Sequence, residues 1–259
     1  MNKGITKTLS ATPESFSLRR IPLDRLVPPS SGEVHLWFLD LGELSGSLSA
    51  ALGGRCDNPS PATPGQLLMA RRFYLRLLLG AYLGLPGKAV KINRKNRGKP
   101  ILDATVHEEE IHFSMAKSED KLLIGISASS HIGVDLERAG RHARNAMGVA
   151  RRYFSADEAA ALAALDASLR DEAFLRAWAC KESVVKASGM GIANQFHRFS
   201  VQTDINRQAA VLDFDGKGPG DWSLALVQPS DTFLGALAIE DRLTSLKTFK
   251  LVAAGNQPG

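Results

Sequence analysis

The stretch that most constrains the fold is Phe174–Gly191 (FLRAWACKESVVKASGMG), which predicts a long amphipathic helix. Its apolar side chains recur at the three- and four-residue spacing of one helix face, and Gly189 predicts its end. Because a step of four residues advances only about 40° around a helix, Trp178, Glu182 and Lys186 share one stripe. A carboxylate between a buried tryptophan and a lysine can bind a metal ion or accept a proton. It can equally be a solvated glutamate–lysine pair that stabilises the helix by roughly 0.3 kcal/mol.

A second motif, His131–Glu137 (HIGVDLE), predicts a strand that carries two carboxylates on one face. Side chains two residues apart on a strand project to the same side, so Asp135 and Glu137 point together. Two neighbouring carboxylates repel each other unless a cation or solvent separates them. Mg²⁺ meets this requirement, because it prefers oxygen ligands and combines one or two carboxylates with waters and substrate phosphates. The alternative is that both acids, near a strand end, simply face water.

The order of the predicted elements indicates an α+β fold. Helices are expected at residues 66–83, 141–154 and 155–165, the last with Ser155 before an acidic first turn as a capping pattern. Apolar or alternating segments predict strands at residues 33–40, 90–93, 111–116, 122–127, 131–137, 198–202, 209–214, 222–227 and 233–239, the last four as an antiparallel meander. The pattern suggests two similar α+β halves in one chain.

We expect the chain to divide near residues 127–130. Residues 31–128 would form an N-terminal α+β half, and residues 129–252 a C-terminal half that carries the metal and base residues. The remaining segments are expected to lack regular structure: a disordered tail at 1–30, a long loop at 41–65 and a tail at 253–259.

Length and composition narrow the class of protein. The 259 residues can bury a sizeable core, and no apolar run approaches the roughly 20 residues of a membrane span. The N-terminus lacks the apolar segment of a secretory signal; a transit peptide is conceivable, although a disordered tail fits better. The two cysteines, Cys56 and Cys180, lie far apart and outside any motif, which argues for a reducing compartment and against a zinc site. We therefore expect a cytoplasmic protein.

Positive charge is concentrated between Arg71 and Lys99. This block holds nine basic residues and no acidic one, in a chain of net charge +5. It can attract phosphates, nucleic acid or an acidic protein, or be a solvated basic face. Nucleic acid is the weakest of these hypotheses, because the block has few aromatic residues and no recognisable DNA- or RNA-binding motif.

Three motifs occur in a fixed order: GKP at Gly98–Pro100, GVDLE at Gly133–Glu137 and WACKESVVKASGMG at Trp178–Gly191. In this order and separation they resemble the 4′-phosphopantetheinyl transferases of the Sfp-like (surfactin-synthetase-activating) class. The resemblance implies an enzyme that moves the phosphopantetheine arm of coenzyme A onto a serine of an acyl or peptidyl carrier protein and releases adenosine 3′,5′-bisphosphate. Fatty acid, polyketide and nonribosomal peptide biosynthesis all remain open as the pathway. It also implies two similar halves related by a pseudo-twofold axis, with coenzyme A and Mg²⁺ or Mn²⁺ in the cleft between them.

The resemblance also assigns roles to individual residues. Asp135, Glu137 and Glu182 match the metal-binding acids, and Glu182 also matches the candidate base for the serine hydroxyl. Lys186 matches the lysine that contacts the pyrophosphate, so it joins Glu182 as a candidate catalytic residue. The candidate coenzyme A contacts are Lys99 of the GKP turn, Lys117, Lys186, Arg71 and Arg72. Independently, breaking a pyrophosphate bond requires neutralising phosphate charge, and a serine hydroxyl requires a positioned base.

Two stretches depart from the family pattern. Where the family has F-N-x-S-H-S, this chain has Phe113–Ser118 (FSMAKS), so Ala116 replaces the serine and Lys117 the histidine that bind a coenzyme A phosphate. Lys117 supplies a flexible point charge, whereas Ala116 supplies no hydroxyl. Residues 57–66 lack the basic residues that family members use for the adenosine 3′-phosphate. The alternative is therefore a non-catalytic or weakened relative that binds a carrier protein without efficient transfer.

Partners and assembly follow from the same assignments. Coenzyme A and a carrier protein are the expected partners, whereas nucleic acid and membranes are not. A nucleic-acid-associated protein stays as a third hypothesis that rests on the basic block alone. Because two halves in one chain supply a whole cleft, we expect a monomer.

Overall fold

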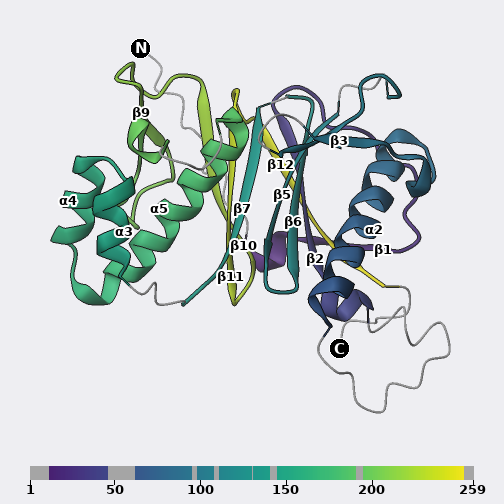
Figure 1. Cartoon of the computed structure of the whole chain (residues 1–259), viewed down its shortest axis with the longest axis horizontal. Coiled ribbons are helices and arrows are strands. Elements are labelled where there is room, and N and C mark those ends of the chain that lie inside the picture. The colour runs from purple at the N-terminus through teal and green to yellow at the C-terminus, as the bar shows by residue number, and fades with distance from the viewer. Residues whose placement is uncertain are drawn as a thin grey trace.

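Two β-sheets pack face to face, and helices cover the outer side of each (Figure 1). This computed structural model describes residues 12–45, 62–94, 98–107, 111–129, 131–140, 145–190 and 195–253. The strands are β1 (Ser17–Arg20), β2 (Glu33–Asp40), β3 (Ile92–Arg94), β4 (Pro100–Leu102), β5 (His112–Ser118), β6 (Lys121–Ser127), β7 (Ile132–Arg138), β8 (Phe199–Val201), β9 (Val211–Phe214), β10 (Trp222–Ser230), β11 (Phe233–Glu240) and β12 (Ser245–Val252). The helices are α2 (Pro64–Leu83), α3 (Ala146–Tyr153), α4 (Ala156–Ala164) and α5 (Ala167–Ser188), with 3₁₀ turns η1 (Pro13–Ser15), η2 (Gly87–Ala89) and η3 (Phe196–Arg198). The α+β class predicted from the sequence is confirmed.

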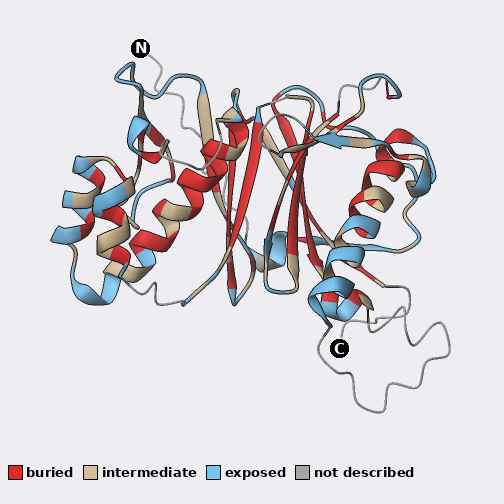
Figure 2. Ribbon diagram, viewed as in Figure 1, coloured by how far each residue is buried: buried red, intermediate tan, exposed pale blue. Residues whose placement is uncertain are grey.

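The larger sheet brings strands from both ends of the chain together. Its order is β1–β12–β2–β6–β5, with β12 parallel to β1 and β2, and with β6 antiparallel to β2 and β5. Along β2, Trp37 and Leu39 pack under α2, whereas Leu36 and Phe38 pack against the smaller sheet. Figure 2 shows the central strands buried and the outward faces of the helices exposed. A strand buried on both faces needs apolar residues on both, as β2 has from Leu36 to Leu39.

The smaller sheet has the order β10–β11–β7, with both strand pairs antiparallel. Leu237 and Ile239 of β11 face the larger sheet together with Val134 of β7, and they form part of the core between the sheets. On the other face of β11, Ala236 and Ala238 pack in the core that contains α5. This alternation gives the smaller sheet one face for the larger sheet and one face for α5.

Helices begin and end where their capping residues predict. The Thr63 side chain accepts from the Gln66 N–H at the start of α2, and the Gln66 side chain accepts from the Thr63 N–H. Ser155 and Glu158 form the same reciprocal box at α4. α5 ends at Gly189, whose φ of 68° lies in the left-handed region that favours glycine.

Four strands differ from the sequence-based expectation. β1 lies within the segment expected to be a tail, and the adjacent Phe16 is buried in the core between the sheets. β8 and β9 form a separate two-stranded sheet, so the last four predicted strands are not one meander. β12 was not predicted, because Lys247 and Lys250 interrupt its apolar pattern. β1 and β12 pair with each other across most of the chain, and a local pattern does not contain such pairing.

Some expectations fall on residues that the structure does not describe. Residues 46–61 of the predicted 41–65 loop and residues 254–259 of the C-terminal tail lie outside the described ranges; residues 41–45 are helical. The expected division near residues 127–130 falls between β6 and β7. Within the described ranges, no helix combines the length and apolarity needed to cross a bilayer.

Candidate active site

α5 crosses β7 at Gly133, where no side chain separates the two backbones. A β-carbon added at Gly133 would overlap the carbonyl oxygen of Ser183 and crowd the backbone nitrogen of Ala187. The glycine of the GVDLE motif is therefore needed for close packing rather than for a turn. Asp135 follows two residues later, so its side chain leaves the same face of β7 toward α5.

This crossing brings Asp135, Glu182 and Lys186 together. Nζ of Lys186 lies 2.6 Å from Oδ1 of Asp135 and 3.7 Å from Oε2 of Glu182. The shorter contact is a charge-assisted hydrogen bond. Two acids and one cation that the sequence singled out in separate motifs thus form one cluster between β7 and α5.

Burial changes the acidity of both carboxyl groups. Asp135 is 6% exposed and Glu182 is 9% exposed. Burial raises the pKa of Asp135 above its ordinary value, and the Lys186 ammonium opposes this rise. Burial also raises the pKa of Glu182, and the neighbouring Asp135 carboxylate adds to the rise. A carboxylate with a raised pKa is a stronger proton acceptor, so Glu182 suits the role of a general base.

A cavity of about 390 Å³ opens beside this cluster. Its wall comes from β5, the β5–β6 turn, β7 and α5, through Lys117, Ser118, Glu119, Asp135, Leu136, Glu137, Arg138 and Glu182. The three predicted metal-binding acids therefore border one cavity. Lys117 is exposed and brings a cation from β5 to the same space.

The cavity offers oxygen atoms to a cation. Oδ2 of Asp135 is buried without a hydrogen-bond partner. Burying an acceptor in this way costs free energy unless a bound ligand contacts it. The parts of the chain that the structure describes contain no group of three or more His, Cys, Asp or Glu side chains close enough to share one metal ion. Lys186 instead contacts both Asp135 and Glu182. Mg²⁺ prefers oxygen ligands. The unpartnered Oδ2 of Asp135, together with the carboxylates of Glu137 and Glu182 on the same cavity, fits that preference.

Lys99 links the GKP turn to this crossing. Its Nζ donates hydrogen bonds to the carbonyl oxygens of Ile132 and Lys186, each at 2.9 Å. These carbonyls lie at the start of β7 and in the last turn of α5, where a cation also interacts favourably with the helix dipole. The structure thus brings Lys99 to the backbone that frames the cluster rather than to the cavity wall.

Arg71 and Arg72 border a second hollow of about 260 Å³, not the carboxylate cavity. Its lining combines arginines with apolar side chains from α2, β3, β4 and β5: Leu68, Arg71, Arg72, Leu75, Arg76, Ile92, Arg94, Pro100 and Met115. The two hollows are adjacent along β5, because Met115 and Lys117 are two residues apart on one strand face. The second hollow suits an anionic group with an apolar part attached.

A buried ion pair behind Glu182 was missed by the sequence analysis. Nζ of Lys181, which is 0% exposed, lies 2.8 and 2.7 Å from the two carboxylate oxygens of Glu158 and 2.6 Å from the carbonyl oxygen of Phe199. Glu158 also accepts from the backbone N–H of Val201. The pair joins α4, α5 and β8, and so fixes the rotation of α5 that directs Glu182 to the cavity. Lys181 was visible as a charge in an apolar helix, but its partner 23 residues away was not.

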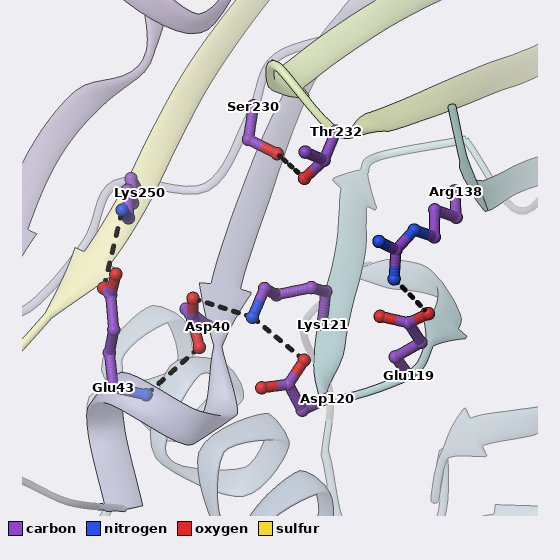
Figure 3. Close-up of polar contacts among 9 residues, drawn as sticks. All are labelled: Asp40, Glu43, Glu119, Asp120, Lys121, Arg138, Ser230, Thr232 and Lys250. Atoms are coloured by element: carbon purple, nitrogen blue, oxygen red, sulfur yellow. Dashed lines mark hydrogen bonds and ion pairs between the residues drawn. The ribbon is translucent and has the colours of Figure 1, made fainter. Parts of the chain in front are cut away.

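An exposed ion pair lies at the edge of the cavity, between β7 and the β5–β6 turn (Figure 3). Nη1 of Arg138 lies 2.8 Å from Oε1 of Glu119, and both side chains are about half exposed. Such a pair adds little to stability. It does hold together the ends of two strands that belong to different sheets.

The region of the site matches a known family model. Residues 131–239, which include β7 and α5, match the family described as the 4′-phosphopantetheinyl transferase superfamily. This span contains Asp135, Glu137, Glu182 and Lys186.

Individual relatives extend the similarity over more of the chain. The 4′-phosphopantetheinyl transferase HetI of Nostoc sp. is 29% identical in a match that covers 81% of this chain and 88% of HetI. The 4′-phosphopantetheinyl transferase of Bacillus subtilis is 26% identical, over 58% of this chain and 70% of that protein. The L-aminoadipate-semialdehyde dehydrogenase-phosphopantetheinyl transferase of Homo sapiens is 23% identical, over 62% of this chain and 57% of its own length.

Proposed function

The chain belongs to the 4′-phosphopantetheinyl transferase superfamily, in its Sfp-like class, and on that premise we propose that it transfers 4′-phosphopantetheine from coenzyme A to a serine of an acyl or peptidyl carrier protein. Adenosine 3′,5′-bisphosphate is the second product. The observation that carries the proposal is the cluster of Asp135, Glu182 and Lys186 on a cavity that Lys117 also borders. It combines buried carboxylates with cations, as a reaction at a pyrophosphate requires.

Asp135, Glu182 and Glu137 would hold Mg²⁺, with Mn²⁺ as the alternative. The unpartnered Oδ2 of Asp135 supports this assignment. When bound, the metal ion would supply positive charge to the pyrophosphate oxygens. Lys186, whose Nζ lies near both acids, would exchange its contact with Asp135 for a phosphate oxygen of the substrate.

Glu182 acts as the base in the proposed reaction. The serine oxygen forms a bond to the phosphorus of the phosphopantetheine group while its proton passes to Glu182, directly or through a water molecule. The bond from that phosphorus to the bridging oxygen breaks, and adenosine 3′,5′-bisphosphate leaves with the bond's electron pair. Lys186 stabilises the charge that develops on the phosphate oxygens.

Coenzyme A would lie between the two halves of the chain, residues 31–128 and 129–252. Lys117, which borders the cavity, would contact a phosphate, and Arg71 and Arg72, which border the adjacent hollow, would contact the nucleotide phosphates. Lys99 contributes charge from the GKP turn while it holds α5 and β7. A cytoplasmic monomer is part of the same proposal.

Intact-protein mass spectrometry of an apo carrier protein, incubated with this protein, coenzyme A and Mg²⁺, tests the function. We expect a mass gain of one phosphopantetheine that is absent with EDTA. Glu182→Gln removes the base but keeps its shape, so transfer should fall by about 100-fold or more while the protein stays folded. Near-normal turnover of this variant would refute the role of Glu182.

The FSMAKS stretch supports a second candidate function, which is carrier-protein binding without efficient transfer. Ala116, at the position of the family's serine, is buried between the sheets and offers no hydroxyl to a phosphate. A relative that binds carrier proteins without efficient transfer would give no mass gain with any carrier, no measurable coenzyme A affinity, and carrier binding in a pull-down. Coenzyme A binding would count against this candidate.

A further inference from the structure

The turn between β5 and β6 holds a glutamate in a strained backbone conformation. Glu119 has a φ of 54°, in the left-handed region that favours glycine. Within the described ranges, the other non-glycine residues with a positive φ are Asn145 and Asp215. Asparagine and aspartate enter this region more easily, because their short side chains form hydrogen bonds to the nearby backbone. Glutamate lacks that advantage, so the backbone of the turn does not explain a glutamate at position 119.

The ion pair with Arg138 does not explain this glutamate through stability either. Nη1 of Arg138 donates a hydrogen bond to Oε1 of Glu119 at 2.8 Å, and the two side chains are 53% and 51% exposed (Figure 3). A pair this exposed contributes little to the free energy of folding. A strained residue whose contact adds so little to stability is a candidate for a functional role.

Both members of the pair border the carboxylate cavity. Arg138 is the last residue of β7 and lies on the strand face that Leu136 turns toward the larger sheet. The charged side chains of the cavity wall are four carboxylates and two cations, Lys117 and Arg138. An anionic substrate therefore depends on these cations, and Glu119 already holds one of them.

The guanidinium of Arg138 suits a phosphate as well as it suits a carboxylate. Arginine presents its N–H groups as a planar fork that matches the oxygens of either group. The carboxylate of Glu119 occupies Nη1 as a phosphate oxygen would, so Glu119 competes with the substrate for the same donor. Because an exposed pair is weak, a phosphate can displace the carboxylate at little cost in free energy.

We propose that Arg138 binds the pyrophosphate of coenzyme A by exchanging Glu119 for a phosphate oxygen, and that Glu119 thereby sets the affinity for this substrate. The proposal rests on the proposed function, which brings a pyrophosphate to the carboxylates of this cavity. In the free protein the pair links β7 to the β5–β6 turn. In the complex Arg138 contacts the substrate, and the link is broken.

Isothermal titration calorimetry of coenzyme A into the full-length protein with Mg²⁺, at about 0.15 M salt and without a carrier protein, tests the exchange. Arg138→Gln should raise Kd about tenfold, the cost of one hydrogen bond to a charged group. Glu119→Gln should lower Kd about threefold, because the competing pair is weak and exposed. The matched control is Asp120→Asn, which removes a carboxylate from the same turn. Asp120 pairs with Lys121 instead, so this variant should leave Kd unchanged.

Two further titrations separate exchange from other effects of charge. In a protein that already carries Arg138→Gln, Glu119→Gln should no longer lower Kd; an equal fall in that background would indicate simple repulsion and overturn the exchange. The loss in Arg138→Gln should persist with dephospho-coenzyme A, which keeps the pyrophosphate and lacks the 3′-phosphate. Disappearance of the loss with this ligand would overturn the assignment to the pyrophosphate.

Thermal unfolding of Glu119→Gly tests the reason for the glutamate. The midpoint should stay unchanged or rise, because glycine relieves the strained φ. A lower midpoint would show that Glu119 is kept for stability and would overturn its functional role.

The inference and the proposed function can fail separately. An unchanged Kd in both Arg138→Gln and Glu119→Gln, with a wild-type protein that modifies a carrier, would overturn the exchange alone. Failure of the wild-type protein to modify any carrier would overturn the proposed function, whereas the two opposite shifts in Kd would still support the exchange.

Discussion

At the scale of single residues, Glu33 at the start of β2 is the most perturbed acid outside the cavity. Its carboxylate accepts hydrogen bonds from the Ser30 N–H and hydroxyl at 3.1 Å each, and Lys247 of β12 pairs with it. The Lys247 contact, opposed by burial, lowers the pKa of Glu33 to about 2. Two residues along the strand, burial lowers the pKa of His35, whose Nδ1 lies 2.7 Å from the Tyr82 hydroxyl.

Both shifts affect stability in the same direction. A depressed pKa means that the folded state binds fewer protons than the unfolded chain, so stability rises with pH across the affected window. For Glu33 the contribution is complete above its ordinary pKa of 4.5 and is lost as pH falls toward about 2. For His35 the ordinary pKa in the unfolded chain is 6.5. Its contribution to stability is complete above pH 6.5 and is lost as the pH falls below that value.

Glu33→Gln should lower the free energy of unfolding by about 2 kcal/mol at pH 7, because it removes a charge-assisted contact. The difference from wild type should shrink below pH 4.5 as Glu33 itself becomes protonated. Urea unfolding at several pH values measures this. The control is Glu43→Gln, whose partner Lys250 lies 3.5 Å away at an exposed site (Figure 3), with an expected change of about 0.5 kcal/mol or less. A difference for Glu33→Gln that is independent of pH would contradict the assignment.

At the scale of elements, the crossing of α5 and β7 determines the geometry of the cavity. Gly133→Ala would push Ser183 away, and so would separate Asp135 from Lys186. We expect a loss of about 2 kcal/mol of stability, typical of an overpacked core, and a fall in transfer activity even under conditions where the variant is folded. Thermal unfolding and turnover measure the two effects.

Gly65→Ala is the matched control for that substitution. Gly65 lies in the first turn of α2 with no atom closer than 4.0 Å to an added β-carbon, so alanine should be neutral or slightly stabilising there. Equal behaviour of the two variants would show that the close approach at Gly133 does not control the site.

At this scale, the spacing of residues within one strand or one helix predicted which side chains share a face. Two-residue spacing placed Asp135 and Glu137 toward one cavity, four-residue spacing placed Glu182 with Lys186, and Gly189 marked the helix end. These are properties of one strand or one helix. The contacts between elements were not predictable, because the pairing of Lys181 with Glu158 and the bonds of Lys99 to backbone carbonyls require the folded arrangement. For the same reason Arg71 and Arg72, grouped by charge with Lys99, lie in a separate hollow.

At the scale of the whole molecule, β12 ties the end of the chain to its beginning. It lies between β1 and β2, and pairs with both in parallel. An N-terminal fragment of residues 1–129 would therefore lack a central strand of its own sheet.

We expect neither this fragment nor residues 130–259 to fold alone, and both to recover structure and activity when co-expressed. Circular dichroism of each fragment and of the mixture measures this, with the intact chain as reference. A 1–129 fragment that unfolds cooperatively by itself would show that β12 is dispensable for the larger sheet.

The position of β12 also sets an order of events during protein synthesis. The smaller sheet has all its strands once residue 240 has left the exit tunnel, so β7, β10 and β11 can assemble before β12 has emerged. The larger sheet, which carries Lys117, has to wait for residues 245–252 to leave the exit tunnel. The emerging chain therefore completes the sheet that carries Asp135 and Glu137 before the sheet that carries Lys117, and the two walls of the cavity face each other in their final form only after β12 has paired.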